Sequence, residues 1–528
     1  MDSLATADTS APVWAGTRRL VSFRDDVAVE RQAGAVAIAH RWGTVVVRDP
    51  SRGLAAALHR LTFGPTRAAN VVDLVATGSV EPAAEVIRLH SLLNDLRFLL
   101  VHTVEVNSAT VAEIVPMAMG ARLGGLLGAT TVPTGVRVRL SRFAYLRELD
   151  GAMSLENPLS LYRARLADPR LVALVAAAAS PATVRELVDL ACPGAVPAGR
   201  AVLDLLVGAG LLDVVEPESS GPDEARRTRL RQWGFHDLLF HTRSRSGRHD
   251  DDFGATFRFI QDIEHERPVR ELPDGPRVPL PVPDLDDVLA TDPRLTVALE
   301  TRKSIRRPGE RPIDADQLGE VLYRTARVRA VYGPDQARQL PYQGVDRPYP
   351  ACGGAGELDL WLTVSRCAGL DAGIYYYDPA GHQLVRINTN RSDVDAMLAV
   401  ASISAGNVAP PDVLVTITSR FQRLGWQYSG MSYATTLKHV GVLYQTFYLV
   451  CTAMGLAPCG LGVGDIELSA RCLGLDWERE GSVGEFMISG SPADEDRSRH
   501  AAQGMSGWRE YNGGGWRRVA GRPEENPA

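Results

Sequence analysis

The spacing of apolar residues predicts regular elements in two zones of the chain and an extended segment between them. In residues 13–215, apolar side chains recur three and four positions apart, as on one face of a helix. Residues 291–510 alternate such helical stretches with strand patterns. Residues 216–290 are polar and rich in proline, which is typical of an extended linker. We therefore expect two folded zones joined by this linker.

The first zone contains a weak internal repeat. The stretch ALHRLTFGPTRAANVVDLV (57–75) aligns with ALVAAAASPATVRELVDLA (173–191). After a turn of slightly different length, HSLLNDLRFLLVHTVEV (90–106) resembles DLLVGAGLLDVVEPE (204–218). Each unit predicts a strand, a helix, a turn, a helix and a strand, which together make a winged-helix shape. We therefore expect two winged-helix-like modules, at residues 13–128 and 129–215, and we interpret the second as a peptide-binding module.

Three uses of these modules stay open at the level of sequence. The helices can simply build a small core. DNA recognition is disfavoured, because few Arg or Lys residues fall in the second helix of the repeat. The third use is the binding of a peptide as an added strand on the wing.

The second zone predicts a sheet flanked by helices. Alternating apolar residues in 358–364 indicate a strand, a hairpin turns at 378–381, and the nearly continuous apolar run in 410–421 indicates a buried central strand. Residues 433–454 predict a long helix with almost no charge, and a helix that is apolar around its circumference is buried or lies in a subunit interface. This pattern favours a homodimer. The sequence APCGLGVG (457–464) predicts a loop that presents backbone N–H groups.

Composition narrows the class of protein. A chain of 528 residues is too long for one core, and 45% hydrophobic with 23% charged residues is typical of globular proteins. The net charge of -6 argues against a nucleic-acid partner or an anionic membrane surface. We expect disordered tails at 1–12 and 511–528.

The sequence also indicates the cellular compartment and whether to expect a metal site. The N-terminus carries no secretory signal, and no apolar run approaches the roughly 20 residues of a membrane-spanning helix. The six cysteines form no CxxC pair, so we expect reduced thiols, a cytoplasmic protein and no disulfide framework. His236 and His241 lie five positions apart, off a shared helical face, so we expect no metal site.

A basic cluster opens the second zone. Arg302, Lys303, Ser304 and Arg306 place three cations and a hydroxyl shortly before a helix that Asp314 begins. Planar guanidinium groups suit bidentate contacts with phosphate, and the serine hydroxyl adds a donor. The cluster predicts a phosphate site, and a solvated surface is the alternative.

A loop of small residues precedes the strand at 358–364. It contains Pro350, Ala351, Cys352 and Gly353. Glycine in such a loop lets the backbone approach a flat ligand closely. An ordinary turn is the alternative, and the loop is no dinucleotide fingerprint, because no helix with an acidic ribose partner follows it.

Five stretches in this order resemble the nitroreductase-like flavoprotein superfamily. They are GFHDLLFHTRSRSGRHDDDFG, RKSIRR, YPACGG, LKHVGVLYQTFYLVCTAMGLAPCGLG and GEFMISGSP. The resemblance covers residues 225–500 and is closest to the SagB-type branch, the azoline dehydrogenases of peptide biosynthesis. It implies an α+β fold with a mixed sheet flanked by helices over 291–510. It also implies FMN as cofactor, a precursor peptide as substrate, and a complex with a cyclodehydratase. The implied reaction oxidises thiazoline or oxazoline rings to thiazoles or oxazoles.

The resemblance also implies which positions contact FMN. Residues 302–306 match the segment at the phosphate and the pyrimidine edge, and 350–353 match a loop packed on the isoalloxazine, with Ala351 in place of the usual serine. Residues 459–462 match the loop near the reactive N5 edge, and a basic pair near 498 closes over the phosphate. The implied contacts are Arg302, Lys303, Ser304, Arg306, Pro350, Ala351, Cys352, Gly353, Cys459, Gly460, Leu461, Gly462, Arg497 and Arg499.

The sequence departs from the family at the implied catalytic pair. Peptide azoline oxidases often carry an adjacent Lys-Tyr pair, whereas this chain has Gln427 and Tyr428. A neighbouring ammonium would lower the pKa of a tyrosine, and an amide cannot do so. Either Tyr428 acts as a neutral donor, or Lys438 or His439 supplies the charge, or the substrate differs. Plain packing of the aromatic ring is the alternative for Tyr428.

Two other functions stay open at this stage. One is an NAD(P)H-dependent nitro- or quinone reductase, which the long N-terminal zone disfavours. The other is a non-catalytic scaffold that recruits precursor peptide, which the changes at Gln427 and Ala351 allow.

Overall fold

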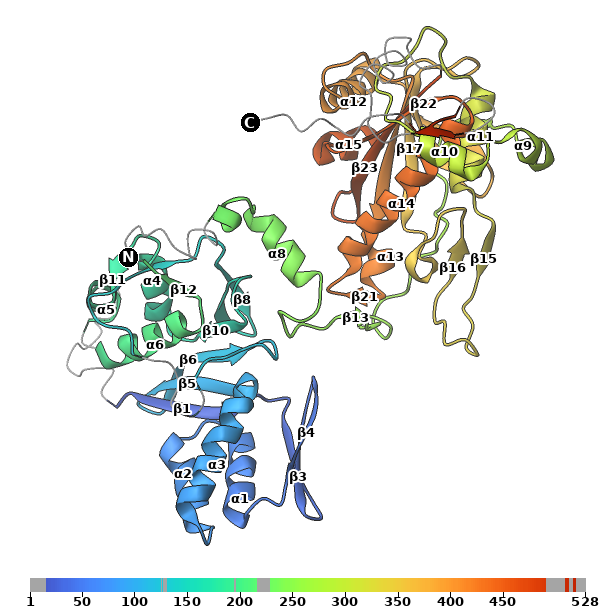
Figure 1. Cartoon of the computed structure of the whole chain (residues 1–528). Helices are drawn as coiled ribbons and strands as arrows, with labels where there is room; N and C mark the ends of the chain where they lie inside the picture. The colour runs from blue at the N-terminus through green and yellow to red at the C-terminus, as the bar shows by residue number, and fades with distance from the viewer. Residues whose placement is uncertain are drawn as a thin grey trace, which may run out of the picture. The chain divides into compact units, whose positions relative to one another are not determined.

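The computed structural model of the chain divides into two units, Met1–Asp251 and Asp252–Ala528 (Figure 1). The residues that it describes are 16–124, 126, 131–193, 196–215, 228–490, 509–511 and 516–518. The division falls inside the segment for which the sequence predicts a linker. The predicted tail 1–12 and most of the predicted tail 511–528 lie outside the described residues, as do Arg497 and Arg499.

A six-stranded antiparallel sheet forms the middle of the N-terminal unit. In sheet order its strands are β1 (Arg18–Phe23), β5 (Leu100–Val106), β6 (Ala109–Pro116), β10 (Tyr162–Leu166), β9 (Ala152–Glu156) and β8 (Tyr145–Leu149). Strands from both predicted modules therefore belong to one sheet.

Seven helices of this unit fall within the described residues. They are α1 (Arg52–Arg60), α2 (Ala68–Thr77), α3 (Pro82–Asp95), α4 (Pro169–Ala177), α5 (Val184–Ala191), α6 (Val196–Gly208) and α8 (Phe235–Arg243). Figure 1 shows α1–α3 on one side of β1 and β5 and α4–α6 on the other. One hydrophobic core joins both sets of helices to the sheet.

Helices lie at matching places in the two copies of the sequence repeat. The first copy, 57–75, contains the end of α1 and most of α2, and the second, 173–191, contains most of α4 and all of α5. Each unit therefore has three helices, of which α3 or α6 is the last, where the predicted order has a leading strand and two helices. The winged-helix form of the two modules is not confirmed.

Two small sheets complete the N-terminal unit. One is the three-stranded sheet of β2 (Ala28–Gln32), β3 (Ala35–His40) and β4 (Gly43–Arg48). The other has the order β11 (Ala182–Thr183), β7 (Arg137–Leu140) and β12 (Leu212–Val214). Strand β12 is therefore an edge strand.

A seven-stranded sheet forms the middle of the C-terminal unit. In sheet order its strands are β14 (Arg277–Pro279), β19 (Gln383–Asn388), β18 (Gly373–Asp378), β17 (Leu358–Val364), β20 (Val413–Arg420), β23 (Glu480–Ser489) and β22 (Ala457–Leu461). Every pairing described in it is antiparallel, which corrects the expectation of a mixed sheet. The consecutive strands β17, β18 and β19 follow one another through short connections, which antiparallel pairing allows and parallel pairing does not.

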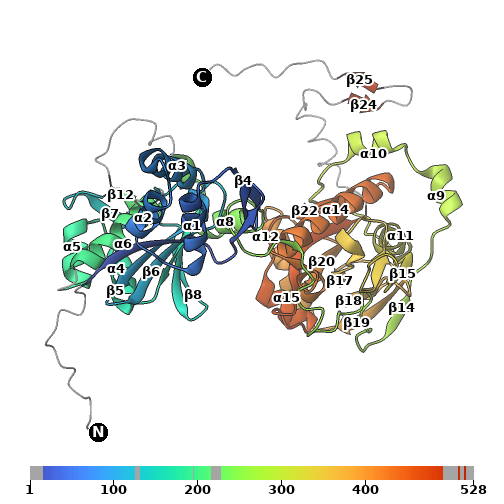
Figure 2. The same cartoon turned by 90° about the horizontal axis from the view of Figure 1, so that it is seen from below.

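Helices cover both faces of this sheet. Helices α11 (Ala315–Ala326) and α14 (Ser432–Ala453) pack on one face, and α12 (Arg391–Ser404) and α15 (Ile466–Leu473) on the other (Figure 2). Strand β17 is buried along its whole length, because its alternate side chains enter two different cores. The α+β, nitroreductase-like class predicted for this unit agrees with this architecture. Among the described residues, no helix is long and apolar enough to cross a bilayer.

Short elements of the C-terminal unit complete the description. They are β13 (Gly254–Ala255), α9 (Leu285–Thr291), α10 (Leu295–Thr301), β15 (Ala330–Tyr332), β16 (Gly344–Asp346), the 3-10 turn η3 (Cys352–Gly354), α13 (Phe421–Gly425), β21 (Tyr428–Ser429), β24 (Arg509–Tyr511) and β25 (Trp516–Arg518). The predicted strand, hairpin, central strand and long helix are all present as β17, β18–β19, β20 and α14.

Candidate active site

The first group of candidate residues gathers around Tyr448, in the last third of α14. The Tyr448 hydroxyl lies 2.7 Å from the Ser304 hydroxyl and accepts a hydrogen bond of 2.8 Å from the backbone N–H of Gly460. The Arg302 guanidinium lies over the Tyr448 ring, 5.0 Å from its centroid. Tyr448 therefore joins two predicted cofactor segments that are distant in sequence. We call Arg302, Ser304, Tyr448 and Gly460 the phosphate-side cluster.

The three cations of residues 302–306 are available to a bound anion. Lys303 and Arg306 are exposed, and no carboxylate among the described residues forms an ion pair with them or with Arg302. The backbone N–H of Ile305 donates to the carbonyl of Pro458 at 2.8 Å, which fastens the segment to β22. Three cations and a hydroxyl on an anchored segment fit the phosphate of a nucleotide cofactor.

The segment 457–464 differs from its prediction as a loop. Residues Ala457–Leu461 form the edge strand β22, paired with β23. Proline is tolerated there because an edge strand has one side without ladder bonds. The hydroxyl of Tyr444 accepts from the backbone N–H of Glu485 at 2.7 Å and donates to the carbonyl of Leu461 at 3.2 Å. Of the four cofactor contacts predicted at 459–462, three lie on this strand and only Gly462 lies beyond its end.

The second group gathers around Tyr428, which lies on β21. The Sγ atom of Cys352 lies 3.0 Å from the Tyr428 hydroxyl oxygen. Burial, and next the contact with Cys352, raises the pKa of Tyr428 well above its usual value. The hydroxyl therefore stays protonated at neutral pH, which favours a neutral donor among the alternatives weighed from the sequence.

His439 is held between a carboxylate and a backbone N–H. Its Nδ1 lies 2.5 Å from the Glu357 carboxylate, and its Nε2 lies 2.8 Å from the backbone nitrogen of Cys352. A backbone N–H can only donate, so Nε2 accepts and the proton of a neutral ring is on Nδ1. This arrangement ties α14 to the 352–354 turn and leaves no ring nitrogen facing Tyr428. We call Cys352, Glu357, Tyr428 and His439 the tyrosine-side cluster.

Gln427 belongs to a separate hydrogen-bond chain. The Tyr342 hydroxyl donates to the carbonyl of Gly353 at 3.0 Å, because a carbonyl can only accept. The same hydroxyl oxygen then accepts from Nε2 of Gln427 at 2.8 Å. This order fixes the amide, and its Oε1 is buried with no hydrogen-bond partner among the described residues. The side chain of Gln427 is thus committed to Tyr342 rather than to Tyr428.

Lys438 is not brought to either group. It is exposed on α14, and no described contact joins it to Tyr428. The two groups are themselves apart, because His439 and Tyr448 are nine residues apart on one helix, or about 13 Å along its axis. A cavity of about 400 Å³ borders the predicted isoalloxazine loop, with Pro350, Ala351 and Gly354 in its lining.

The Gly353 position should not tolerate a side chain. Its φ is +60°, and a Cβ atom there would lie 2.6 Å from the Tyr342 hydroxyl. We expect Gly353→Ala to lower the free energy of unfolding by about 1–3 kcal/mol, measured by urea denaturation. Gly462→Ala is the matched control, because its Cβ would meet no described atom within 4 Å. Equal stability of the two variants would contradict the described geometry of the loop.

The sequence did not single out several residues that organise these groups. They are Tyr342, Glu357, Arg423, Tyr444 and Tyr448. Two of them could have been found from the sequence, because Tyr444 and Tyr448 stand four apart on a helix with almost no charge and so share a face. Fully buried Arg423 donates to the carbonyl of Ala355 at 2.7 Å beneath the loop, and burial lowers its pKa to about 9.

Comparison with known proteins agrees with this architecture. Residues 299–489 match the nitroreductase family, and residues 138–250 match the family described as cyanobactin oxidase ThcOx. The C-terminal unit is thus a nitroreductase-like domain, and the chain is an oxidoreductase. Together the two matches confirm the resemblance to the SagB-type dehydrogenases of the nitroreductase-like superfamily.

Individual proteins resemble the chain only at low sequence identity. "Putative nitroreductase MJ1384" of Methanocaldococcus jannaschii is 24% identical over 188 residues, which are 36% of this chain and 85% of that protein. A solved structure of a "putative nitroreductase" from Ralstonia eutropha JMP134 is 20% identical, covers 43% of this chain and 97% of its own, and has a TM-score of 0.32. The E. coli microcin synthetase McbBCD complex with truncated pro-MccB17 bound is 16% identical, covers 44% and 80%, and has a TM-score of 0.30.

Proposed function

We propose that this protein is an FMN-dependent dehydrogenase that oxidises thiazoline or oxazoline rings in a ribosomally made precursor peptide. The observation that carries the proposal is the contact between Tyr428 and Cys352. It joins the tyrosine expected in proton transfer to the loop expected against the isoalloxazine. The match of residues 138–250 to a cyanobactin oxidase supports a peptide substrate over a small nitro compound.

The phosphate-side cluster would hold the cofactor. Arg302, Lys303 and Arg306 would bind the phosphate by charge-assisted hydrogen bonds, with the Ser304 hydroxyl as a further donor. The loop 350–353 would lie against the ring system. When bound, FMN supplies a two-electron acceptor for the ring hydrogens.

The protein's own residues would then handle the proton and the orientation. Tyr428 keeps its hydroxyl proton, because burial raises its pKa, and it can donate a hydrogen bond to the reacting ring or to a neighbouring base. His439 and Glu357 would fix the backbone of Cys352, so that the loop keeps one position. Lys438 and Gln427 have no direct part in this proposal.

The reaction can be tested on the purified chain. Flavin-loaded protein is incubated with a synthetic peptide that carries one thiazoline ring, and mass spectrometry follows the loss of two hydrogen atoms. We expect conversion to the thiazole at one ring per catalytic cycle. A protein that carries flavin and leaves the ring intact would contradict the proposal.

A homodimer is part of the proposal. Within one chain, α14 leaves Tyr433 and Leu437 exposed, at 46% and 38%, together with Gly441 and Gln445 on the same side. The exposed side of α14 carries one charged residue, Lys438, and helix faces with so little charge can pair in subunit interfaces. A cyclodehydratase partner would bind elsewhere on the chain.

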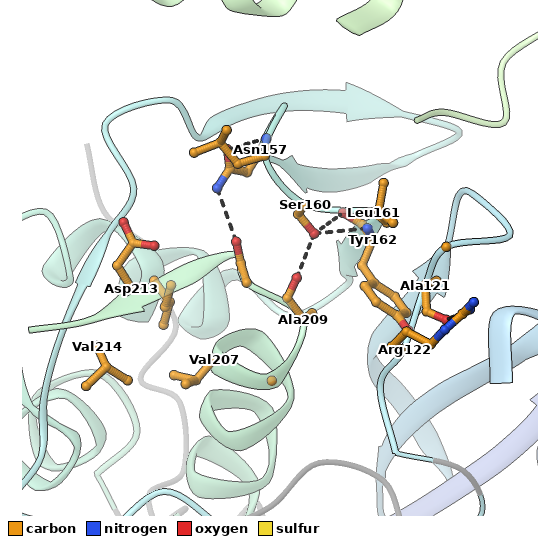
Figure 3. A pocket seen from close by; sticks show the side chains of 15 residues that line it. Ala121, Arg122, Asn157, Ser160, Leu161, Tyr162, Val207, Ala209, Asp213 and Val214 are labelled. Carbon is orange, nitrogen blue, oxygen red and sulfur yellow. Dashed lines mark hydrogen bonds between the residues drawn. The ribbon is translucent and has the colours of Figure 1, made fainter. Parts of the chain in front are cut away.

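The N-terminal unit would dock the precursor peptide. A cavity of about 360 Å³ lies beside the edge strand β12, and Figure 3 shows Asp213, Val214 and Val207 on one side of it and Tyr162 and Arg122 on the other. The backbone N–H of Val215 donates to Arg137 of β7, so in the antiparallel ladder the N–H of Val214 points to the open edge. A peptide strand could add to this edge.

This docking can be tested at the open edge. Val214→Pro in the full chain removes the outward N–H without removing a bond to β7, and we expect precursor-peptide binding to weaken roughly tenfold. Fluorescence anisotropy of a labelled leader peptide measures the affinity. Val214→Ala keeps the N–H and should bind as the wild type does. If Val214→Pro and Val214→Ala bound the leader peptide equally well, the peptide would not dock at the open edge of β12.

All six cysteines lie within the described residues, and no disulfide joins any of them there. Free thiols support a reducing compartment, and we propose that the protein acts in the cytoplasm.

A further inference from the structure

The function proposed above uses Cys352 only as a contact between the loop and Tyr428 and gives its thiol no chemical step. Its Sγ is 3.0 Å from the Tyr428 hydroxyl, and its own backbone N–H is fixed 2.8 Å from His439. The side chain is only half-buried, whereas Cys192, Cys451, Cys459 and Cys472 are buried. A thiol held in one position and still partly open is placed to meet a ligand.

While both groups keep their protons, either the Tyr428 hydroxyl or the Cys352 thiol can donate the hydrogen bond between them. A sulfur that has lost its proton can only accept. Burial raises the pKa of Tyr428, so the phenol keeps its proton and is the donor to such a thiolate. A donated hydrogen bond stabilises the thiolate, and the thiolate is the reactive form.

A second observation at the same loop points to a ligand. Oε1 of Gln427 is a buried acceptor without a partner among the described residues, and it lies 3.0 Å from the position that a Cβ on Gly353 would occupy. The bond of Nε2 to Tyr342 prevents the amide from turning round. A buried acceptor without a donor costs about 1–3 kcal/mol, and an N–H of a ligand bound at this turn would supply the donor.

We propose that Cys352 is the base that removes the Cα proton of the azoline ring, with Tyr428 as its hydrogen-bond donor. The proposal rests on the function proposed above. The Cα–H bond breaks, its proton forms an S–H bond at Cys352, and its electron pair becomes the new ring double bond. A hydride leaves the adjacent ring carbon, and the flavin accepts it. The thiol later returns its proton to water.

The groups around Cys352 come from four parts of the chain. Tyr428 on β21 faces the sulfur, and Tyr342 lies near the same turn. His439 on α14 and Glu357 before β17 act on the backbone N–H rather than on the sulfur. Tyr428 is thus the group among them that directly controls the thiol.

Two substitutions of Cys352 separate a base from a packing residue. The full-length, flavin-loaded protein is assayed with a peptide that carries one thiazoline ring. We expect Cys352→Ala and Cys352→Ser each to lower kcat by about 10²- to 10⁴-fold with unchanged flavin content. Serine keeps the size and the hydrogen bond but lacks an acidic proton, so rescue by serine would overturn the proposal. Cys367→Ala, at the other half-buried thiol, should keep wild-type turnover.

A second readout needs no turnover. Iodoacetamide labelling at pH 7, mapped by peptide mass spectrometry, compares Cys352 with Cys367 in the same sample. We expect Tyr428→Phe to slow labelling of Cys352 by about two- to tenfold, because the thiolate loses a hydrogen bond, and to leave Cys367 unchanged. An unchanged rate at Cys352 would overturn the pairing. If wild-type protein with flavin bound leaves the thiazoline intact, the proposed function fails, and the role of Cys352 as its base fails with it.

Discussion

Replacing Tyr428 by phenylalanine should lower turnover of a thiazoline peptide by about 10²- to 10⁴-fold and leave the flavin content unchanged. The substitution removes one hydroxyl and little volume from a side chain that is mostly buried on β21. The lost group is the donor that lies 3.0 Å from Cys352. Steady-state kinetics with the flavin-loaded enzyme measures the effect.

The pH dependence of the wild type checks the same residue. Because burial raises the pKa of Tyr428 above that of an exposed tyrosine, its hydroxyl should give no inflection in kcat below about pH 10. Tyr323→Phe on α11 is a matched control, and it should keep wild-type turnover. If Tyr428→Phe kept full turnover with flavin bound, the hydroxyl would have no catalytic role and the side chain would serve only in packing.

Arg302→Ala should weaken FMN binding by about ten- to a hundredfold. One charge-assisted phosphate contact contributes on the order of 1.5–3 kcal/mol, and no described carboxylate competes for this guanidinium. Loss of the cation also removes the contact with the Tyr448 ring, which anchors the phosphate-side cluster. Titration of the apoprotein with FMN, followed by quenching of flavin fluorescence, measures the dissociation constant.

A charge-matched control separates the local phosphate contact of Arg302 from the effect of the protein's overall charge on FMN binding. Arg294 precedes α10 and lies outside the phosphate-side cluster, so Arg294→Ala removes the same charge at a distance. Its FMN affinity should stay within about twofold of the wild type. Equal losses in the two variants, or no loss in either, would remove Arg302 from the proposed phosphate site.

Local pattern was enough to predict most elements of the C-terminal unit. The long helix at 433–454 is α14, and the strand at 358–364 is β17, because hydrophobic period reports the face that each residue presents. The edge strand β22 was missed, since its proline and glycine have low strand propensity and pairing with β23 decides the outcome. Strand direction was also beyond the pattern, because period does not distinguish parallel from antiparallel pairing.

Less of the candidate site than of the fold could be predicted from the sequence. The segments 302–306 and 350–353 were predicted as cofactor contacts, but the partners that position them come from far along the chain. His439 meets Glu357 across 82 positions, and Gln427 meets Tyr342 across 85. Spacing along one element cannot predict such contacts, which depend on how the sheet and α14 pack together. Arg497 and Arg499, outside the described residues, stay predictions.

The most direct test of the proposed function follows the flavin spectrum in two anaerobic mixing experiments. Flavin-loaded protein is mixed with a peptide that carries one thiazoline ring, and a second sample is mixed with NADH. The account predicts that the peptide bleaches the visible absorbance and is recovered as the thiazole, while NADH leaves the flavin oxidised. Bleaching by NADH together with an unchanged flavin in the presence of the peptide would contradict it, and would identify the protein as a reductase of the nitroreductase type.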